Sequence, residues 1–423
     1  MIKHTALSIC WCLLLFQPPL RAQTRSLTLR ETCSLATANY PLVKQYNLIA
    51  ESAKYAAEQA HTGYLPQINV NGQATYQSAV TQLPIQLPGE DVPSLSNDQY
   101  KLFGEVSQSL YDGGRIKLQK AAIEAAAEVE QQAVNVAQYQ IKERVTQLFF
   151  GVLLLDAQLA QIGLLINDIQ AGMAKTGAAI ANGTALKSSG SLLEAELLKA
   201  EQHNIALQTT RTAYLHMLGL FINQQLDEDT VLERPEAAPS TAAINRPELG
   251  WYAQQQSSID VDRKLLTAKN RPRLGLFMQG GLGRPALNML SNDFEAYYYG
   301  GIRLAIPLSG FYTLKKEKAT LDIRKKIIDV QKDVFLFNTD LAMKQQNTEI
   351  AKYAKLLARD DKIIALRSSV KAAALAQLEN GIINTADYLR EVNAEDNARL
   401  TKIQHEIELL KAQYNLQYTA GNL

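Results

Sequence analysis

Two long stretches without proline constrain the fold of this chain more than any other feature. All 13 prolines lie outside residues 94–234 and 308–423. Both stretches are rich in Ala, Leu, Glu, Lys and Gln, which are strong helix formers. Apolar residues recur every seven positions, at Val134, Ile141, Leu148, Leu155, Ile162 and Ile169 in the first stretch, and from Leu314 to Val370 in the second, where only Glu349 interrupts. Because a helix keeps such a column aligned only against a partner helix, we expect coiled-coil helices of about 60 residues, roughly 90 Å long.

Four shorter segments, near residues 66–78, 99–111, 272–283 and 293–308, alternate apolar and polar residues. This alternation predicts β-strands with one apolar and one wet face, each about as long as the 9–11 residues of a membrane strand. The positions that we expect to face lipid are Ile68, Val70, Leu102, Val106, Leu274, Leu276, Ile302, Leu304 and Ile306. Aromatic residues near the strand ends suit either a membrane-interface girdle or packing within the sheet. They are Tyr76, Tyr100, Tyr111, Phe294 and the cluster Tyr297–Tyr299.

Four strands are too few to close a membrane barrel, since the smallest single-chain barrels have about eight. An open sheet in lipid would leave the N–H and C=O groups of its edges unpaired, at several kcal/mol each. We therefore expect several chains to pool their strands. Three copies would form a 12-stranded barrel, continued by a tube of paired helices, in a membrane protein of mixed α and β structure.

The predicted elements occur twice along the chain. Each half contains a helix, two strands, a very long helix, an Asn-Gly turn and a return helix. Matching motifs such as Pro66 and Pro272 are separated by nearly constant offsets, which indicates a tandem duplication. The first repeat spans 23–222, the second spans 248–423, and a linker at 223–247 joins them.

The first 22 residues have the features of an export signal peptide. Lys3 and His4 precede a short apolar run, and the small residue Ala22 precedes the expected cleavage site. The run is too short to cross a bilayer, and a buried N-terminal helix is the alternative interpretation. Beyond it we find no apolar run of about 18 residues, and we expect no membrane-spanning helix.

Several motifs together resemble the TolC family of outer-membrane efflux proteins, across essentially the whole mature chain. They are Leu65-Pro66-Gln67-Ile68 at a strand start, the Leu-Tyr-Asp-Gly-Gly segment at 110–114, the repeated Asn-Gly turns, and the segment 387–394 after Gly381. The resemblance implies a homotrimer in the cell outer membrane with a long periplasmic extension. It implies a passive exit duct of a tripartite efflux or type I secretion system. The implied partners are outer-membrane lipid, a periplasmic adaptor (membrane fusion) protein and an inner-membrane pump of the RND, ABC or MFS class.

The same resemblance suggests where contacts and closure occur. It implies that the turns Asn182-Gly183 and Asn380-Gly381 contact the adaptor and that the periplasmic tip is closed. Family members usually carry an aspartate where this chain has Asn393, so a ring of aspartates is not expected here. The candidate gate residues near the second turn are Asp387, Arg390, Glu391 and Asn393. A solvated helix face is the alternative interpretation of these charges.

No pattern in the chain indicates catalysis. The histidines lack metal-ligand spacing, and no nucleophile elbow or phosphate-binding loop is present in the sequence. The balance of 43 basic and 42 acidic residues gives no sign of nucleic-acid binding. We therefore expect no catalytic residue, metal or cofactor, and Cys33 to pack on its helix. A periplasmic or surface coiled-coil scaffold is the main alternative to a channel, and an exported hydrolase has no supporting residues.

Overall fold

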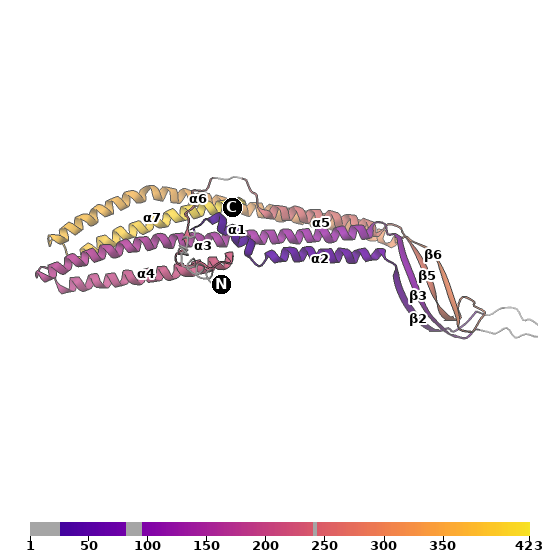
Figure 1. Cartoon of the computed structure of the whole chain (residues 1–423). Coiled ribbons are helices and arrows are strands. Elements are labelled where there is room, and N and C mark those ends of the chain that lie inside the picture. The colour runs from indigo at the N-terminus through magenta and orange to yellow at the C-terminus, as the bar shows by residue number, and fades with distance from the viewer. Residues whose placement is uncertain (1–25, 82–94, 240–242) are drawn as a thin grey trace, which may run out of the picture. The chain divides into compact units, whose positions relative to one another are not determined.

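The computed structural model describes residues 26–81, 95–239 and 243–423, with its elements labelled in Figure 1. The predicted signal peptide and most of the predicted loop at 78–98 lie outside the described residues. The chain divides into two compact units, and the long helices α3 (Arg115–Ala181) and α6 (Phe311–Glu379) contribute residues to both. The sheet unit covers the described residues within Pro41–Ala137 and Arg246–Asn338, and the helical unit covers those within Met1–Tyr40, Gln138–Asn245 and Thr339–Leu423.

The sheet unit contains a four-stranded antiparallel sheet in the order β2-β3-β5-β6 (Figure 1). The strands are β2 (Gln67–Tyr76), β3 (Asp98–Tyr111), β5 (Arg273–Arg284) and β6 (Glu295–Ala305). The four strands that the alternation predicts are therefore present. They form a single sheet because β3 pairs with β5, which joins strands from the two halves of the chain. Among the described residues, the edge strands β2 and β6 each pair with one neighbour only.

Helices precede or follow the strands of the sheet unit. They are α2 (Val43–His61), which continues into a short 3-10 turn (Thr62–Tyr64), α5 (Pro247–Lys269), and the first parts of α3 and α6, the latter preceded by a 3-10 turn (Leu308–Gly310). Lys325 on α6 donates to Asp260 on α5 at 2.9 Å, and Arg263 pairs with Asp322 at 3.0 Å. Such exposed pairs each contribute about 1 kcal/mol or less, so they align the helices more than they stabilise them.

The Asp112-Gly113-Gly114 segment explains how β3 turns abruptly into α3. The Asp112 carboxylate accepts hydrogen bonds from the backbone N–H groups of Gly114 at 2.9 Å and Ile116 at 2.6 Å. It thereby satisfies donors that the first turn of the helix leaves without partners. Gly113 and Gly114 have φ values of +72° and +80°, a conformation that favours glycine.

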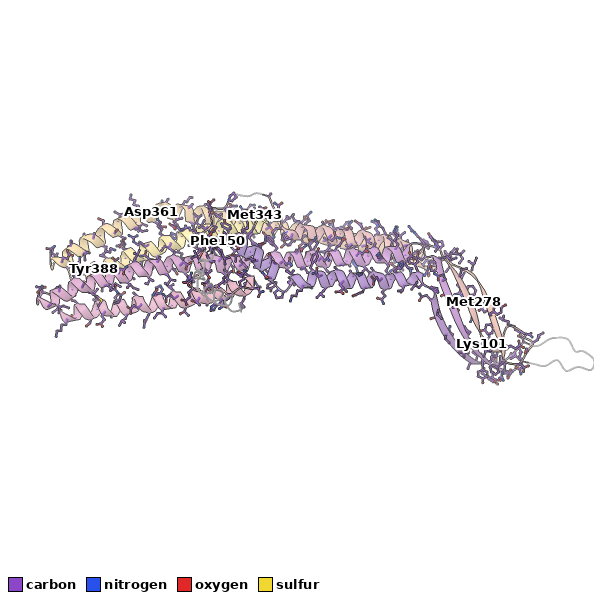
Figure 2. All side chains as sticks on the ribbon, viewed as in Figure 1. Lys101, Phe150, Met278, Met343, Asp361 and Tyr388 are labelled. Atoms are coloured by element: carbon purple, nitrogen blue, oxygen red, sulfur yellow. The ribbon has the colours of Figure 1, made fainter. Side chains whose placement is uncertain are left out.

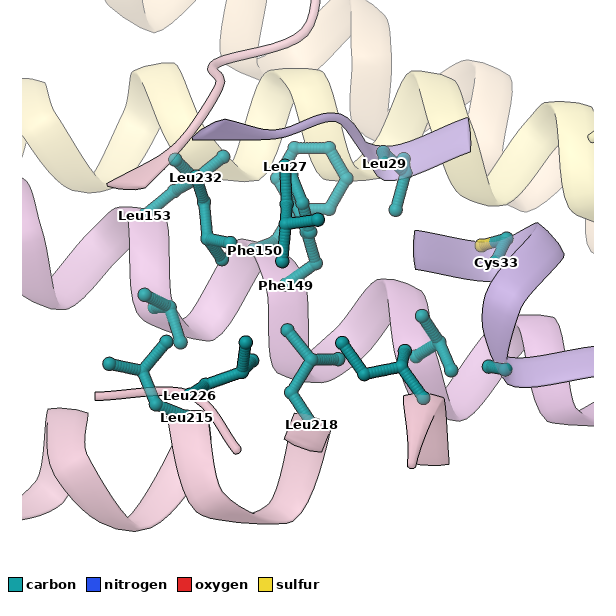
Figure 3. Packing of buried hydrophobic residues seen from close by; sticks show 14 of the residues in the cluster. Leu27, Leu29, Cys33, Phe149, Phe150, Leu153, Leu215, Leu218, Leu226 and Leu232 are labelled. Carbon is teal, nitrogen blue, oxygen red and sulfur yellow. The ribbon is translucent and has the colours of Figure 1, made fainter. Parts of the chain in front are cut away.

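The helical unit packs the remaining helices around an apolar core. Its elements are β1 (Ser26–Leu27), α1 (Leu29–Asn39), α4 (Lys187–Ile222), β4 (Val231–Leu232), α7 (Thr385–Ala420) and the later parts of α3 and α6. Strands β1 and β4 form a small parallel pair. Phe149 and Phe150 of α3 lie in the core with Leu215 and Leu218 of α4 (Figure 3). Each such side chain contributes about 1.5–3 kcal/mol when fully buried.

The two heptad columns behave differently. In α3 the predicted residues Ile141, Leu155, Ile162 and Ile169 are all buried. In α6 the column starts at the half-buried Leu314, is buried at Ile328 and ends at Val370, which is exposed in the single chain. A straight α-helix drifts by about 20° per heptad, which amounts to roughly 120° between Ile328 and Val370. The column of α6 therefore leaves the face that is buried within the single chain.

Among the described residues, one helix could cross a membrane by length and composition alone, although no apolar run of about 18 residues was found in the sequence. Helix α3 contains an 18-residue window with a mean hydropathy of 1.9, of which 44% is buried within the chain. Core side chains such as Phe149, Phe150 and Val152 belong to this helix. Packing against α4 and other core elements accounts for their apolar character.

The order helix, two strands, long helix and return helix occurs twice. It runs α2-β2-β3-α3-α4 in the first half and α5-β5-β6-α6-α7 in the second. The duplication that this order suggests stays a prediction, as do the predicted boundaries of the two repeats.

Candidate functional site

The first candidate surface is one face of the sheet. Residues paired across antiparallel strands point to the same face, and Ile68 pairs with Val106, which pairs with Met278. The same register places Val70, Leu102, Leu274, Leu276, Ile302 and Leu304 on this face, to which Met278, labelled in Figure 2, also belongs. Most of these side chains are exposed in the single chain, and Leu274 is half-buried. Ile306, the remaining predicted position, follows the end of β6 and is exposed as well.

The opposite face of the sheet is polar but carries aromatic rings. Arg303 donates to Glu105 at 3.2 Å and lies over the ring of Phe277 at 4.4 Å from its centroid. The register places Tyr297 and Tyr299 on this polar face, whereas Tyr298 is on the apolar face. The Tyr297–Tyr299 cluster therefore cannot act as one girdle. Phe103 and Phe277 also lie on the polar face, as the alternation along β3 and β5 predicts, although neither was singled out from the sequence.

The second candidate surface is formed by the two helical turns. Gly183 and Gly381 have φ values of +75° and +67°, and no neighbouring atom lies within 4 Å of where a Cβ would stand. The N–H groups of Thr184 and Ile382 donate to the carbonyls of Ala179 at 2.8 Å and Gln377 at 2.9 Å, which satisfies the last carbonyls of α3 and α6. The apolar side chains Leu186 and Ile382 are exposed beside these turns, and the sequence analysis did not single them out.

The four predicted gate residues lie on the first turns of α7 and all have partners in the same chain. Arg390 pairs with Asp387 and with Glu391, both at 3.3 Å. Glu391 also pairs with Arg367 of α6 at 3.5 Å. The Asn393 amide donates to Glu196 of α4 at 3.3 Å. These side chains can therefore couple α7 to α4 and α6.

A deeper charge cluster, which the sequence analysis missed, links α3, α6 and α7. Lys371 donates to Asp168 at 2.8 Å and also pairs with Glu395, which is 2% exposed. Glu395 accepts a second hydrogen bond from Arg399 at 2.6 Å. Asp168 and Lys371 each adjoin a heptad-column residue, Ile169 and Val370 respectively. The sequence therefore did contain a signal for this contact, because opposite charges stand next to the heptad columns of the two long helices.

The pKa values in this cluster follow from burial and pairing. Burial opposes the charge of Glu395, but hydrogen bonds from Lys371 and Arg399 outweigh it and lower the pKa of Glu395. Burial likewise opposes the charge of Lys371, yet its bonds to Asp168 and Glu395 raise its pKa. Burial raises the pKa of the neighbouring Asp396, although the Gln161 amide donates to it at 2.8 Å.

Two further kinds of side chain could carry chemistry, namely the cysteine thiol and possible metal ligands. Cys33 is buried in the core of the helical unit, and burial raises the pKa of its thiol to about 11. Such a thiol is rarely ionised and therefore a poor nucleophile. In the part of the chain that the structure describes, no group of three or more His, Cys, Asp or Glu side chains could hold a metal ion.

Comparisons with known proteins identify the class of fold. No protein-family model and no curated protein matches this sequence. Solved structures match over 93% of the chain and are outer-membrane channels or outer-membrane proteins. The chain therefore has the fold of these proteins, as its resemblance to the TolC family predicts.

Three of these structures illustrate the match. The outer-membrane channel OprN aligns with a TM-score of 0.65 and 13% identity over 90% of its own chain. VceC of Vibrio cholerae aligns with a TM-score of 0.64 and 14% identity over 96% of its chain. The CmeC channel of Campylobacter jejuni gives 0.64 and 13% over 85% of its chain.

Proposed function

We propose that three copies of this chain form a channel that spans the cell outer membrane. The observation that carries the proposal is the sheet, which has one exposed apolar face and two edge strands with a single described neighbour each. Lipid tolerates neither free backbone groups nor an open edge, so the sheet must be completed by other copies. Three copies supply twelve strands, with the apolar faces against lipid and the polar faces around water.

The antiparallel order supports this closure. The strand directions alternate from β2 to β6, so β6 of one copy can pair antiparallel with β2 of the next. Closure must also place the apolar residues of both edge strands on the same side. Ile302 and Leu304 of β6 therefore share a face with Ile68 and Val70 of β2 in the next copy.

The helices serve as the periplasmic part of the duct. Helices α3 and α6 have 67 and 69 residues, about 100 Å each at 1.5 Å per residue. Their turns at Asn182-Gly183 and Asn380-Gly381, with exposed Leu186 and Ile382 beside them, suit contacts with a periplasmic adaptor protein. The channel is passive and not an enzyme, and an inner-membrane pump supplies the energy and selects the substrate.

The charges after the second turn serve as part of the gate. Glu391 links the start of α7 to Arg367 of α6, and Asn393 links it to α4. Arg390 pairs with Asp387 and Glu391 within α7 itself. Opening a tube at this end requires the α6–α7 pair to move relative to α3 and α4. Rearranging these polar contacts is the local step of that movement.

Electrophoresis of outer-membrane fractions tests the proposal. A shared barrel resists detergent until it is heated, so the unheated protein migrates at trimer mass and the heated protein as a monomer. A water-soluble periplasmic species, insensitive to heating, would instead support the coiled-coil scaffold.

A further inference from the structure

Helix α6 carries an exposed stripe on the side away from α7. Ile363, Leu366 and Val370 are exposed there, and Leu366 is 60% accessible. Towards the start of the helix, the stripe continues with basic residues at helical spacing: Lys355, Arg359 and Lys362. None of these three has an acidic partner among the described residues. The stripe is therefore apolar near the turn and basic farther from it.

Helix α4 carries a stripe of complementary character on the side away from α3. Leu198 and Ile205 are exposed there, and Ile205 is 61% accessible. The exposed residues Glu228 and Asp229 of the following loop continue this stripe beyond Ile205. Glu228 is anchored to α4 by Thr212, whose hydroxyl donates to it at 3.4 Å, and by Arg211, which donates to its carbonyl at 2.9 Å. This stripe is apolar near the turn and acidic farther from it.

Contacts within the chain show which positions of the two helices lie at the same height. Helices α3 and α6 run in the same direction, and Asp168 faces Lys371, 203 residues later. Helix α4 returns antiparallel to α3, and Arg211 pairs with Asp156. Within about one helical turn, these pairs place Leu198 level with Val370 and Ile205 level with Leu366. Thr212, which holds Glu228, is level with the segment 355–359.

Copies related by rotation about a channel axis keep each residue at the same position along that axis. Residues that are level within one chain are therefore also level between neighbouring copies. We propose that the α4 stripe of one copy packs against the α6 stripe of the next copy. Leu198 and Ile205 then cover Val370 and Leu366, and Glu228 and Asp229 lie beside Lys355 and Arg359. The proposal rests on the proposed trimer and assigns the surfaces that hold its helical part together.

The pattern explains why both stripes are exposed in a single chain. If α4 of one copy were shifted along α6 of the next, the acidic residues would be separated from the basic ones, or charges would lie against leucine and isoleucine. Opposite charges across an interface act mainly on register and partner choice, whereas the apolar contacts supply the affinity. The partner is therefore a second copy of this chain.

Cysteine cross-linking tests the register. The double variant Ile205→Cys/Leu366→Cys, treated with a short bifunctional maleimide, is expected to give covalent dimers and trimers. The matched control is Leu220→Cys/Leu366→Cys. Leu220 is 84% exposed on α4 but lies about four helical turns farther than Ile205 from the Asn182-Gly183 turn. The parent chain gives the background, since its Cys33 is buried. Cross-linking of the control but not of the first pair overturns the proposed register.

Charge exchange tests the polar part of the interface. Glu228→Arg and Arg359→Glu alone are each expected to lower the temperature at which the trimer dissociates, and the double variant is expected to restore it. Glu194→Arg is the control, because Glu194 is exposed on α4 with no basic residue of α6 at its height. If Arg359→Glu alters ion selectivity without changing the dissociation temperature, the basic stripe lines the lumen and the proposal fails.

These outcomes separate the inference from the proposed function. A heat-sensitive trimer that does not cross-link at Ile205→Cys/Leu366→Cys contradicts the interface and leaves the channel intact. Absence of any trimer in the outer membrane contradicts the proposed function itself.

Discussion

Lys371 of α6 donates a hydrogen bond to Asp168 of α3 at 2.8 Å, across 203 residues of sequence. The same ammonium group pairs with the buried carboxylate of Glu395 on α7, so a single lysine connects three helices. Because Glu395 is nearly inaccessible to water, its charge depends on this lysine and on Arg399. The cluster is therefore a point where the helical unit can be loosened by one substitution.

Removing this lysine should destabilise the helical unit. We expect Lys371→Met to lower the free energy of unfolding by about 1–3 kcal/mol, because it leaves Glu395 with one partner fewer in a buried place. Thermal loss of the helical circular-dichroism signal measures the effect. Lys199→Met is the matched control, since Lys199 is exposed and makes only a surface pair. Equal melting curves for the two variants would contradict the assigned importance of the cluster.

The cluster also predicts a pH dependence. The lowered pKa of Glu395 gives a stabilising contribution that is present above its ordinary value of 4.5 and is lost as the pH falls through the folded-state pKa. The raised pKa of Lys371 gives a contribution that is present below 10.5 and is lost as the pH rises through its folded-state pKa. Melting temperatures across this range should therefore fall at both ends. In Glu395→Gln the acid-side loss should be smaller, and an unchanged profile would refute this assignment.

Asp396 should behave in the opposite way. Burial raises its pKa above 3.8, so its contribution is favourable at low pH and is lost as the pH rises through the folded-state pKa. We expect Asp396→Asn to be at least as stable as the parent chain at pH 7 and to lose that advantage near pH 3. Thermal melts at the two pH values decide this. If the substitution destabilises the chain more at pH 7 than at pH 3, the carboxylate is needed in its charged form.

Adjacent residues on β2 should respond differently to a positive charge. Val70→Arg places a guanidinium on the apolar face of the sheet, at a cost of about 2–4 kcal/mol near the middle of a bilayer. Asn71→Arg places the same group on the polar face and should be tolerated. The yield of heat-sensitive trimer in outer-membrane fractions compares them. Equal yields would mean that the apolar face does not meet lipid.

The charges after the second turn should influence conduction. We expect Asp387→Asn, Arg390→Gln and Glu391→Gln to change the single-channel conductance or the ion selectivity, because each removes a contact at the start of α7. Recordings from reconstituted protein test each variant, with Lys344→Gln as an exposed-charge control. If all three variants conduct as the parent chain does, these residues form an ordinary solvated helix face.

The sequence predicted the features that depend on local patterns. Alternation identified the four strands, and it assigned residues such as Val70 and Leu102 to one face because side-chain direction in a strand has a period of two. Proline-free heptads identified α3 and α6 because a helix brings residues seven positions apart back to nearly the same face. Gly183 and Gly381 were predictable because ending a helix in this way requires positive φ.

Features that depend on pairing between distant segments were not predictable. The Asp168–Lys371 contact needs the relative height of α3 and α6, which no local pattern specifies. The pairing of β3 with β5, which joins the strands of the two halves into one sheet, is likewise not specified by any local pattern. The exposure of Val370 results from a slow drift of the heptad column, which is small within any short window.

Native mass spectrometry of the protein, extracted from outer membranes in detergent, measures how many chains associate. We predict an assembly of three chains, since only then do four strands per chain become the twelve of a closed barrel. A monomer that stays dissolved without detergent would contradict it.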